Sequence, residues 1–304
     1  MAVRYFGLLL LLLWLPVQAG ISVLDDAGHA LVFARPAQRI ISLAPHITEL
    51  LFAAGAGAQL VGVSEFSDYP ETARTITRIG GGGGLDLEAI IALQPDLVVA
   101  WQSGNPEAGI GRLRALGIPV FISEPHYLGD VPDTLLRLGR LAGTGTQASA
   151  QAEAFTRRLQ DLGKQYAGQT AVRVFYQVWD QPLMTVNGEH LISDVIRLCG
   201  GSNVFGGLPA LAPQINVEAV LAADPDVIVI GSDDAGLSAE LQAWRQWPAM
   251  KAVAQDQLYT VRRELLVRHS PRILDGAEQL CAILEKARSE KRMATEGHGK
   301  INKK

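Results

Sequence analysis

The sequence predicts an α/β fold in which two similar lobes, each with a parallel-sheet core, are joined by one long α-helix and enclose a ligand cleft. Three observations lead to this prediction. The chain has 304 residues, more than one core usually supports. Strand-like apolar runs alternate with amphipathic stretches along most of it. The phrase "DLEAIIALQPDLVVAW" at residues 86–101 also returns, in altered form, as "NVEAVLAADPDVIVIG" at residues 216–231.

The first 19 residues predict a cleavable secretory signal. Arg4 precedes an apolar run from Tyr5 to Leu15, and the small-residue pattern Val17-Gln18-Ala19 follows it. The apolar run is shorter than the roughly 20 residues of a typical membrane span, which favours cleavage over a retained anchor. We therefore expect an exported, soluble protein whose mature chain begins at residue 20.

Residues 20–142 are predicted to form the N-terminal lobe. A small β-hairpin is expected around Asp26-Ala27-Gly28, where polar and apolar residues alternate. After it, strand-like and helix-like stretches follow one another, as they do in βα units on a parallel sheet. The expected strands lie at 39–43, 60–63, 97–100 and 119–123, and the expected helices at 47–55, 86–94, 112–118 and 129–143.

Residues 143–168 contain a long helical run without strand signals, and we expect a single helix there that joins the lobes. The C-terminal lobe is predicted at residues 169–287, where the alternation resumes. Residues 288–304 carry six Lys or Arg against two Glu and lack apolar periodicity, which predicts a disordered basic tail. The body, residues 20–287, has 20 basic and 29 acidic residues, and this acidic balance opposes binding to nucleic acid.

Cys199 and Cys281 are the two cysteines of the chain. Cys199 ends a predicted helix and Cys281 lies in the last one, so a disulfide would attach the C-terminal helix to its lobe. Export to an oxidising compartment favours this pairing. Two buried free thiols remain the alternative.

The repeated phrase reads as a helix, a turn and a buried strand in each lobe. Asp86 and Asn216 are suitable N-caps, and the following Glu88 and Glu218 lie in the first helical turn. An acid there stabilises the helix dipole, which is the simpler interpretation. The functional alternative is that the two carboxylates, one on each lobe, make a two-point contact with a cationic partner.

Large polar and aromatic side chains follow several predicted strands, where open α/β sheets bind ligands. Aromatic residues beside an arginine would suit a large flat ligand with polar substituents. No nucleophile and base, phosphate loop or metal motif stands out, so we expect no resident metal or cofactor; an exported enzyme remains a remote alternative. The candidates for the cleft are Phe66, Tyr69, Trp101, Trp179 and Arg268.

Several motifs in order resemble the periplasmic binding proteins that serve ABC importers of cobalamin, ferric siderophores and haem. They span roughly residues 36–287 and are most similar to the cobalamin-binding members. The resemblance implies a periplasmic, non-enzymatic monomer that holds a corrinoid between two lobes. The motifs are "SLAPHITELLFAAG", "VGVSEFSDYP", "DLEAIIALQPDLVVAW", "SGN", "LCGGSNVF", "APQINVEAVLA", "HSPRI" and "QLCAIL".

The same resemblance implies roles for individual residues. Glu88 and Glu218 would dock onto arginines of a dimeric permease in the inner membrane, and Cys199 would pair with Cys281. The ligand contacts carried over are Tyr69, Trp101, Arg268 and Glu264, the last at a position where the family has an aspartate.

Three aromatic ligand contacts of the family are replaced in this chain. Gly82, Met184 and Ala212 stand at the matched positions, and the neighbouring Trp179 could compensate for one of them. These replacements leave haem or a ferric siderophore as the alternative ligand. His46 follows the first strand of the lobe and is a further candidate: either its neutral imidazole binds the metal of the ligand, or it is a polar residue near a helix start.

Overall fold

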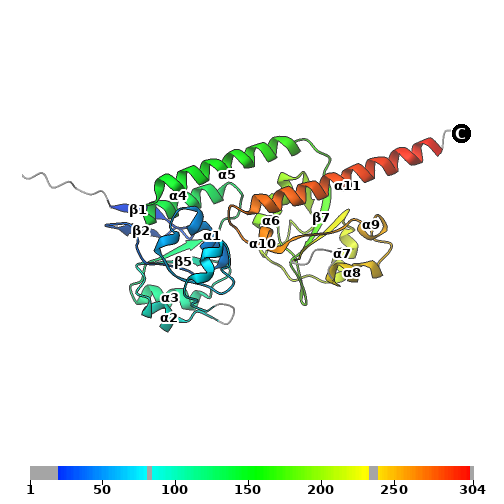
Figure 1. Ribbon diagram of the computed structural model, residues 1–304. Coiled ribbons are helices and arrows are strands. Elements are labelled where there is room, and N and C mark those ends of the chain that lie inside the picture. The colour runs from blue at the N-terminus through cyan, green and yellow to red at the C-terminus, as the bar shows by residue number, and fades with distance from the viewer. Residues whose placement is uncertain (1–19, 81–83, 233–238, 302–304) are drawn as a thin grey trace, which may run out of the picture.

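Two α/β lobes and one bridging helix make up the described part of the chain. The structure is a computed structural model, and it describes residues 20–80, 84–232 and 239–301, with side chains described as far as Met293. In Figure 1 the lobes lie side by side, and helix α5 (Gly145–Tyr166) runs along one side of both. The predicted fold class is confirmed. The predicted signal, residues 1–19, lies outside the described residues.

The N-terminal lobe contains a four-stranded sheet and a separate hairpin. Its elements are β1 (Ile21–Leu24), β2 (Ala30–Phe33), β3 (Ile40–Ser42), α1 (Pro45–Ala53), η1 (Gly57–Gln59), β4 (Leu60–Val63), η2 (Glu71–Thr75), α2 (Leu87–Ala92), β5 (Leu97–Trp101), α3 (Glu107–Ala115), β6 (Val120–Ser123) and α4 (Asp130–Ala142). The sheet is parallel throughout, in the order β4-β3-β5-β6. Because helices cover both of its faces, its strands are short apolar runs that are almost completely buried. The β1–β2 hairpin lies against β6, where the Asp26 amide donates to the Ile122 carbonyl over 3.0 Å.

The C-terminal lobe repeats this plan. Its elements are β7 (Val172–Gln177), β8 (Trp179–Asp180), β9 (Leu183–Met184), α6 (Leu191–Leu198), β10 (Gly201–Asn203), α7 (Val217–Ala223), β11 (Val227–Ser232), α8 (Ala239–Ala243), η3 (Trp244–Gln246), α9 (Lys251–Ala254), β12 (Leu258–Arg262), α10 (Arg263–Val267) and α11 (Ile273–Ile301). Its parallel sheet has the order β10-β7-β11-β12. In both sheets the second strand along the chain therefore pairs with the first, the first with the third, and the third with the fourth.

The two copies of the repeated phrase occupy the same place in the two lobes, as α2–β5 and α7–β11. Asp86 and Asn216 each accept the backbone N–H three residues on, at 2.9 Å in both cases, so both act as the predicted N-caps. Each copy therefore presents its first-turn glutamate from a capped helix.

An arginine side chain holds the C-terminal end of each of these two helices. Arg39 donates to the carbonyl of Leu93 over 2.6 Å, and Arg173 donates to the carbonyl of Ala223 over 2.6 Å. An aspartate of the repeat, Asp96 or Asp226, in turn accepts the backbone N–H of that arginine, at 2.9 and 3.1 Å. The same contacts thus fix α2 and α7 relative to their sheets.

Helix α5 packs closely along α4 and so belongs to the N-terminal lobe as well as to the connection. At Gly139 an added Cβ would lie 2.2 Å from the Cβ of Ala148, so glycine is required for this approach. At its other end, α5 approaches α11: Arg158 forms ion pairs with Asp275 at 2.6 Å and Glu278 at 2.8 Å. Helix α5 covers 145–166 of the range 143–168 expected for the linker.

The prediction of a disordered tail at 288–304 is wrong for residues 288–301, because α11 continues to Ile301. Two features of its sequence explain this. Lys, Arg, Glu, Ala and Met are good helix formers. The side chain of Arg288, within α11, is also buried against the rest of the lobe, where it donates to the carbonyl of Thr170 over 2.8 Å and to the carbonyl of Cys199. Among the described residues, no helix is both long and apolar enough to span a bilayer.

Cys199 and Cys281 form a disulfide, which confirms the predicted pairing. Both residues are fully buried, at the end of α6 and within α11. The bridge therefore attaches the long C-terminal helix to the sheet-bearing part of its lobe.

Replacing both cysteines, Cys199→Ala with Cys281→Ala, is expected to lower the free energy of unfolding by about 4 kcal/mol, because the bridge closes an 82-residue separation. Urea unfolding with and without reductant measures this. The wild type should lose stability in reductant, whereas the double variant, as the control, should not respond. A wild-type midpoint that reductant leaves unchanged would contradict the prediction.

Candidate functional site

A buried carboxylate of the N-terminal lobe joins the two lobes. Glu49, on α1, is only 3% exposed. It accepts hydrogen bonds from three side chains of the C-terminal lobe: Arg268 at 2.9 Å, Arg272 at 3.1 Å and Ser270 at 2.5 Å. A buried charge is tolerated only when it is paired and hydrogen-bonded, and Glu49 meets both conditions.

Arg268 is the centre of this interlobe network. Besides Glu49, it donates to Asp68 at 2.6 Å and to the carbonyl of Phe66 at 3.3 Å. Burial opposes the charge of Arg268, but its bonds to Asp68 and Glu49 outweigh burial and raise its pKa above the ordinary value. The arginine that the family resemblance assigns to the ligand therefore already links the lobes.

Next to this network lies a cluster of aromatic rings from both lobes. His46 of α1 meets Trp101 at a centroid distance of 5.0 Å and His269 at 5.5 Å, and His269 meets His190 at 5.2 Å. His46 and His269 are each 2% exposed. His46 therefore does not face open solvent in this arrangement, because its ring packs against those of Trp101 and His269.

Burial keeps these imidazoles neutral. Burial, together with the charge of Arg268, lowers the pKa of His46 to about 3. Burial and the neighbouring His126 lower the pKa of His190 to about 4, and burial, followed by its histidine neighbours, lowers that of His269 well below its usual range. A proton on any of them would be a charge in an apolar contact.

The N-terminal lobe presents two aromatic candidates in different environments. Phe66 is 74% exposed. Its φ of 61° is unusual for a bulky residue and often marks a functional position. Tyr69 is 46% exposed, and the guanidinium of Arg272 covers its ring at 4.0 Å. Of the two, Phe66 has the freer ring.

The C-terminal lobe offers Trp179 on the β8–β9 hairpin, where it is 52% exposed. Trp179 pairs directly across that hairpin with Met184, and Met184 forms a bridge with Gln214, two residues from Ala212. An exposed indole thus stands beside two positions at which the family pattern is aromatic. The third such position, Gly82, lies outside the described residues.

Glu264 is held by two arginines: Arg272 binds its carboxylate at 2.9 Å, and Arg262 also donates to it. Arg272 therefore connects Glu264, Glu49 and Tyr69 in one network. This arrangement positions Glu264 at the cleft and leaves it without an unpaired charge.

Phe66 borders two hollows, one between the lobes and one within the N-terminal lobe. The first, of about 410 Å³, combines Phe66 and Asp68 with C-terminal residues including Glu264 and Arg268. The second, of about 270 Å³, lies within the N-terminal lobe between Phe66, Trp101 and the loop after β3. Each hollow is at the small end of ligand sites, so a large ligand would fit between the lobes only if they part further.

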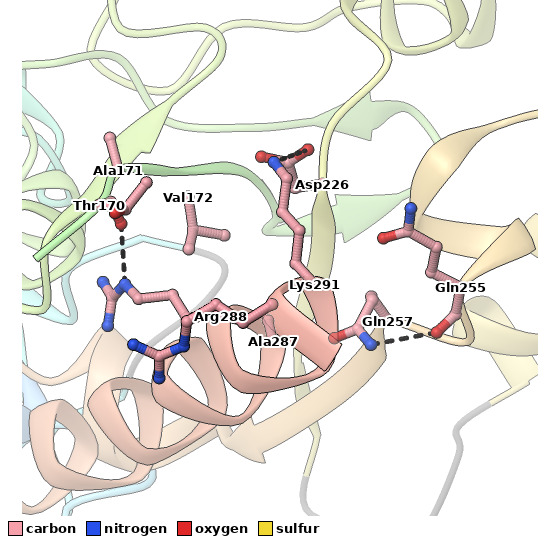
Figure 2. Close-up of a pocket in the computed structure, with 10 residues that line it drawn as sticks. Thr170, Ala171, Val172, Asp226, Gln255, Gln257, Ala287, Arg288 and Lys291 are labelled. Atoms are coloured by element: carbon pink, nitrogen blue, oxygen red, sulfur yellow. Dashed lines mark hydrogen bonds and ion pairs between the residues drawn. The ribbon is translucent and has the colours of Figure 1, made fainter. Parts of the chain in front are cut away.

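Another hollow, of about 370 Å³, lies on the far side of the C-terminal lobe, between the start of β7 and α11 (Figure 2). Its walls are apolar, and its cations are paired: Lys291 with Asp226 at 3.5 Å, and Arg288 with the carbonyl of Thr170 at 2.8 Å. It contains none of the predicted ligand residues, so it is not the interlobe cleft.

Glu88 and Glu218 are exposed in the first turns of α2 and α7. Neither has a hydrogen-bond or ion-pair partner among the residues that the structure describes. Some other first-turn acids are paired locally, for example Glu71 with Arg74 at 3.2 Å, whereas Glu107 of α3 also lacks a partner among the described residues. In Figure 1, α2 and α7 lie away from α5 on their lobes.

The chain matches the family model described as "Periplasmic binding protein" over residues 40–265. The chain belongs to the periplasmic binding protein family. This confirms the predicted resemblance, and it identifies a family of binding proteins.

Among the described residues, no group of three or more His, Cys, Asp or Glu side chains is arranged to hold a metal ion.

Curated relatives in this family are similar over most of their length. The vitamin B12-binding protein of Vibrio cholerae serotype O1 is 39% identical over 256 residues, which are 84% of this chain and 92% of the relative. That of Yersinia pestis is 38% identical over 248 residues, 82% of this chain and 86% of the relative.

Solved structures of the family share the fold. The periplasmic vitamin B12 binding protein of Vibrio cholerae is 38% identical, with a TM-score of 0.77 over 83% of this chain and 98% of that one. A haem-binding protein of Pseudomonas aeruginosa is 24% identical, with a TM-score of 0.70 over 81% and 92% of the two chains. At that identity the second similarity concerns the fold alone.

Sequence reasoning missed the residues that hold the lobes together. Glu49, Asp68 and Arg272 fall inside the quoted motifs, but nothing in their local spacing indicates that they meet. His190 and His269 looked like scattered histidines. The one available signal was that Glu49 is an acid inside the apolar run "ITELLFAAG", where a charge needs a partner.

The neutral histidines predict a loss of stability in mild acid. The pKa values of His46 and His190 are lower in the folded protein than in the unfolded chain, so the unfolded state binds more protons below about pH 6.5. Stability is therefore full above that pH and falls as the pH decreases towards 4, by about 1.4 kcal/mol per pH unit for each histidine that stays neutral.

Urea unfolding at pH 7.5, 6.0 and 5.0 tests this. His46→Phe should make the decline shallower, whereas His29→Gln, which changes a histidine whose side chain is 53% exposed, should leave it as in the wild type. Equal slopes in the wild type and His46→Phe would refute the assignment.

Proposed function

We propose that this protein captures cobalamin or a related corrinoid in the periplasm and delivers it to an ABC importer of the inner membrane. The observation that carries the proposal is the identity of 38–39%, over more than four fifths of the chain, to vitamin B12-binding proteins. The interlobe cleft, with exposed aromatic rings and a charged network at its mouth, supports the same conclusion.

The corrin plane would bind against aromatic surfaces from both lobes. Phe66 and Trp101 supply them on the N-terminal side, and Trp179 supplies one on the C-terminal side, next to Met184. A large flat ligand gains most of its affinity from burying such surface, and polar groups then fix its orientation. Arg268, Glu264 and Tyr69 form that polar edge, and we assign their roles from the family pattern.

Glu88 and Glu218 would contact arginines of the permease dimer, one lobe on each subunit. Their exposure, their lack of partners among the described residues and the matched anchoring of α2 and α7 support this role. Two like charges at fixed separation favour a symmetric cationic partner and one orientation on it.

Haem or a ferric siderophore is the second candidate ligand. Met184 and Ala212 favour it, because they replace aromatic residues that contact the ligand in the cobalamin-binding members that this chain resembles. Trp179 weakens that argument, since its exposed indole lies directly opposite Met184.

The mature protein, from residue 20, is expected to retain one cyanocobalamin per chain through a desalting column, and to retain haemin less well. Visible spectra of the two eluates measure this. Phe66→Ala and Trp179→Ala should each weaken corrinoid binding by about tenfold, because each removes a buried aromatic contact. Leu116→Ala, which trims an exposed side chain at the end of α3, is the control. Haemin retained without cyanocobalamin would replace the proposal by its alternative.

Reversing both docking charges, Glu88→Arg with Glu218→Arg, is expected to abolish transport while leaving ligand affinity unchanged. Uptake of labelled cyanocobalamin by cells and titration of the purified variant measure the two effects separately. The control is Glu107→Arg, which reverses another exposed first-turn charge on the N-terminal lobe, the lobe that carries Glu88. Normal uptake by the double variant would rule out docking through these residues.

A further inference from the structure

Three buried nitrogen atoms without hydrogen-bond partners belong to neighbouring rings where the lobes touch. They are Nε2 of His46, Nε1 of Trp101 and Nδ1 of His269. Their rings are mutual neighbours, with centroid distances of 5.0, 5.5 and 6.2 Å. A buried donor or acceptor that lacks a partner destabilises the arrangement that buries it. Three such atoms on neighbouring rings therefore need an explanation other than packing.

The position of these atoms is that of a ligand site. Trp101 ends β5, and His46 follows β3, so both stand at the carboxyl ends of parallel strands, where α/β sheets bind ligands. Trp101 and Pro45, the residue before His46, line the hollow within the N-terminal lobe, and Arg268, the residue before His269, lines the hollow between the lobes. When the lobes part, these three side chains form the floor of the cleft.

The chemistry of this floor is polar but uncharged. A neutral imidazole has one donor and one acceptor, and an indole has one donor. Burial keeps His46 and His269 neutral by lowering the pKa of each. His190, the fourth ring, already uses Nδ1 to accept the N–H of Ile192 at 3.1 Å. The neighbouring Arg268 is occupied by Glu49 and Asp68.

A primary carboxamide matches such a floor, because it carries a donor and an acceptor and no charge. A carboxylate matches it less well, since it would bring a charge into a site where burial disfavours ions and the adjacent arginine is already paired. Corrinoids carry side-chain carboxamides, whereas haem carries carboxylates. The floor therefore favours corrinoids over haem.

We propose that His46, Trp101 and His269 form a polar floor that recognises the side-chain carboxamides of the ligand. This inference rests on the proposed corrinoid-binding function. The ligand supplies hydrogen bonds to the three nitrogen atoms that lack partners in the unliganded protein. Its binding therefore removes the free-energy cost of burying these atoms unpaired. His46 and His269 thereby act as specificity-determining residues.

The test compares cyanocobalamin with its monocarboxylic acids, in which one side-chain amide is hydrolysed. We expect the wild type to bind at least one of these acids about tenfold more weakly than cyanocobalamin. His269→Phe and His46→Phe keep a ring but remove the nitrogen atoms. They should weaken cyanocobalamin binding by about tenfold and reduce its preference over that acid towards one.

A purely structural role would lower the affinity for both ligands equally and leave their ratio unchanged, and that result would overturn the inference. His29→Phe, in the distant hairpin, should change neither affinity nor ratio and is the control. A wild type that binds no corrinoid would instead refute the proposed function, and this inference with it. The two failures are distinguished by whether the wild type binds cyanocobalamin.

Discussion

The contact between the two lobes on the cleft side is centred on one buried carboxylate, and the backbone N–H of Leu128 also donates across the lobes to Asp194 over 2.8 Å. A single helix, α5, joins the lobes along the chain, and Glu49 adds a second connection on the cleft side through Arg268, Arg272 and Ser270. Removing one partner of a buried ion pair leaves a charge without compensation, which is strongly destabilising. The network is therefore a constraint on lobe separation, and both the hollows and the histidine cluster take their shape from it.

The duplicated architecture explains why this constraint can serve transport. Both sheets have the same strand order, and both carry the helix of the repeated phrase, capped by Asp86 or Asn216 and anchored by Arg39 or Arg173. Identical local construction gives each lobe one exposed glutamate in an equivalent setting. The distance between the two glutamates then depends on the interlobe contact. The affinity of a partner that binds both carboxylates would therefore depend on the arrangement of the lobes.

Local pattern was sufficient to predict the elements and the plan of the fold, because strand-like runs, N-caps and the repeat are encoded within short segments. The disulfide followed from compartment and position. The interlobe contacts could not be predicted, since Glu49 and Arg268 are 219 residues apart and meet only after both lobes have folded. The error in the tail has the same kind of cause: Arg288 anchors α11 through contacts with Thr170 and Cys199 that its own segment does not reveal. For the cleft, the sequence pointed to His46 and to the aromatic candidates, but not to His190 and His269, which reach the cluster from other segments.

Arg268 holds the lobe contact, and under the proposed function it would also bind the ligand. Its two carboxylate partners differ in exposure: the side chain of Glu49 is 2% exposed and that of Asp68 is 38% exposed. Breaking the contact with Glu49 would leave a buried charge, whereas Asp68 can be rehydrated at little loss. A ligand can shift the protein only by the difference in its affinity for the two arrangements. Parting of the lobes is therefore opposed mainly by the contact with Glu49 and little by that with Asp68, and a ligand that holds the lobes apart must supply this difference.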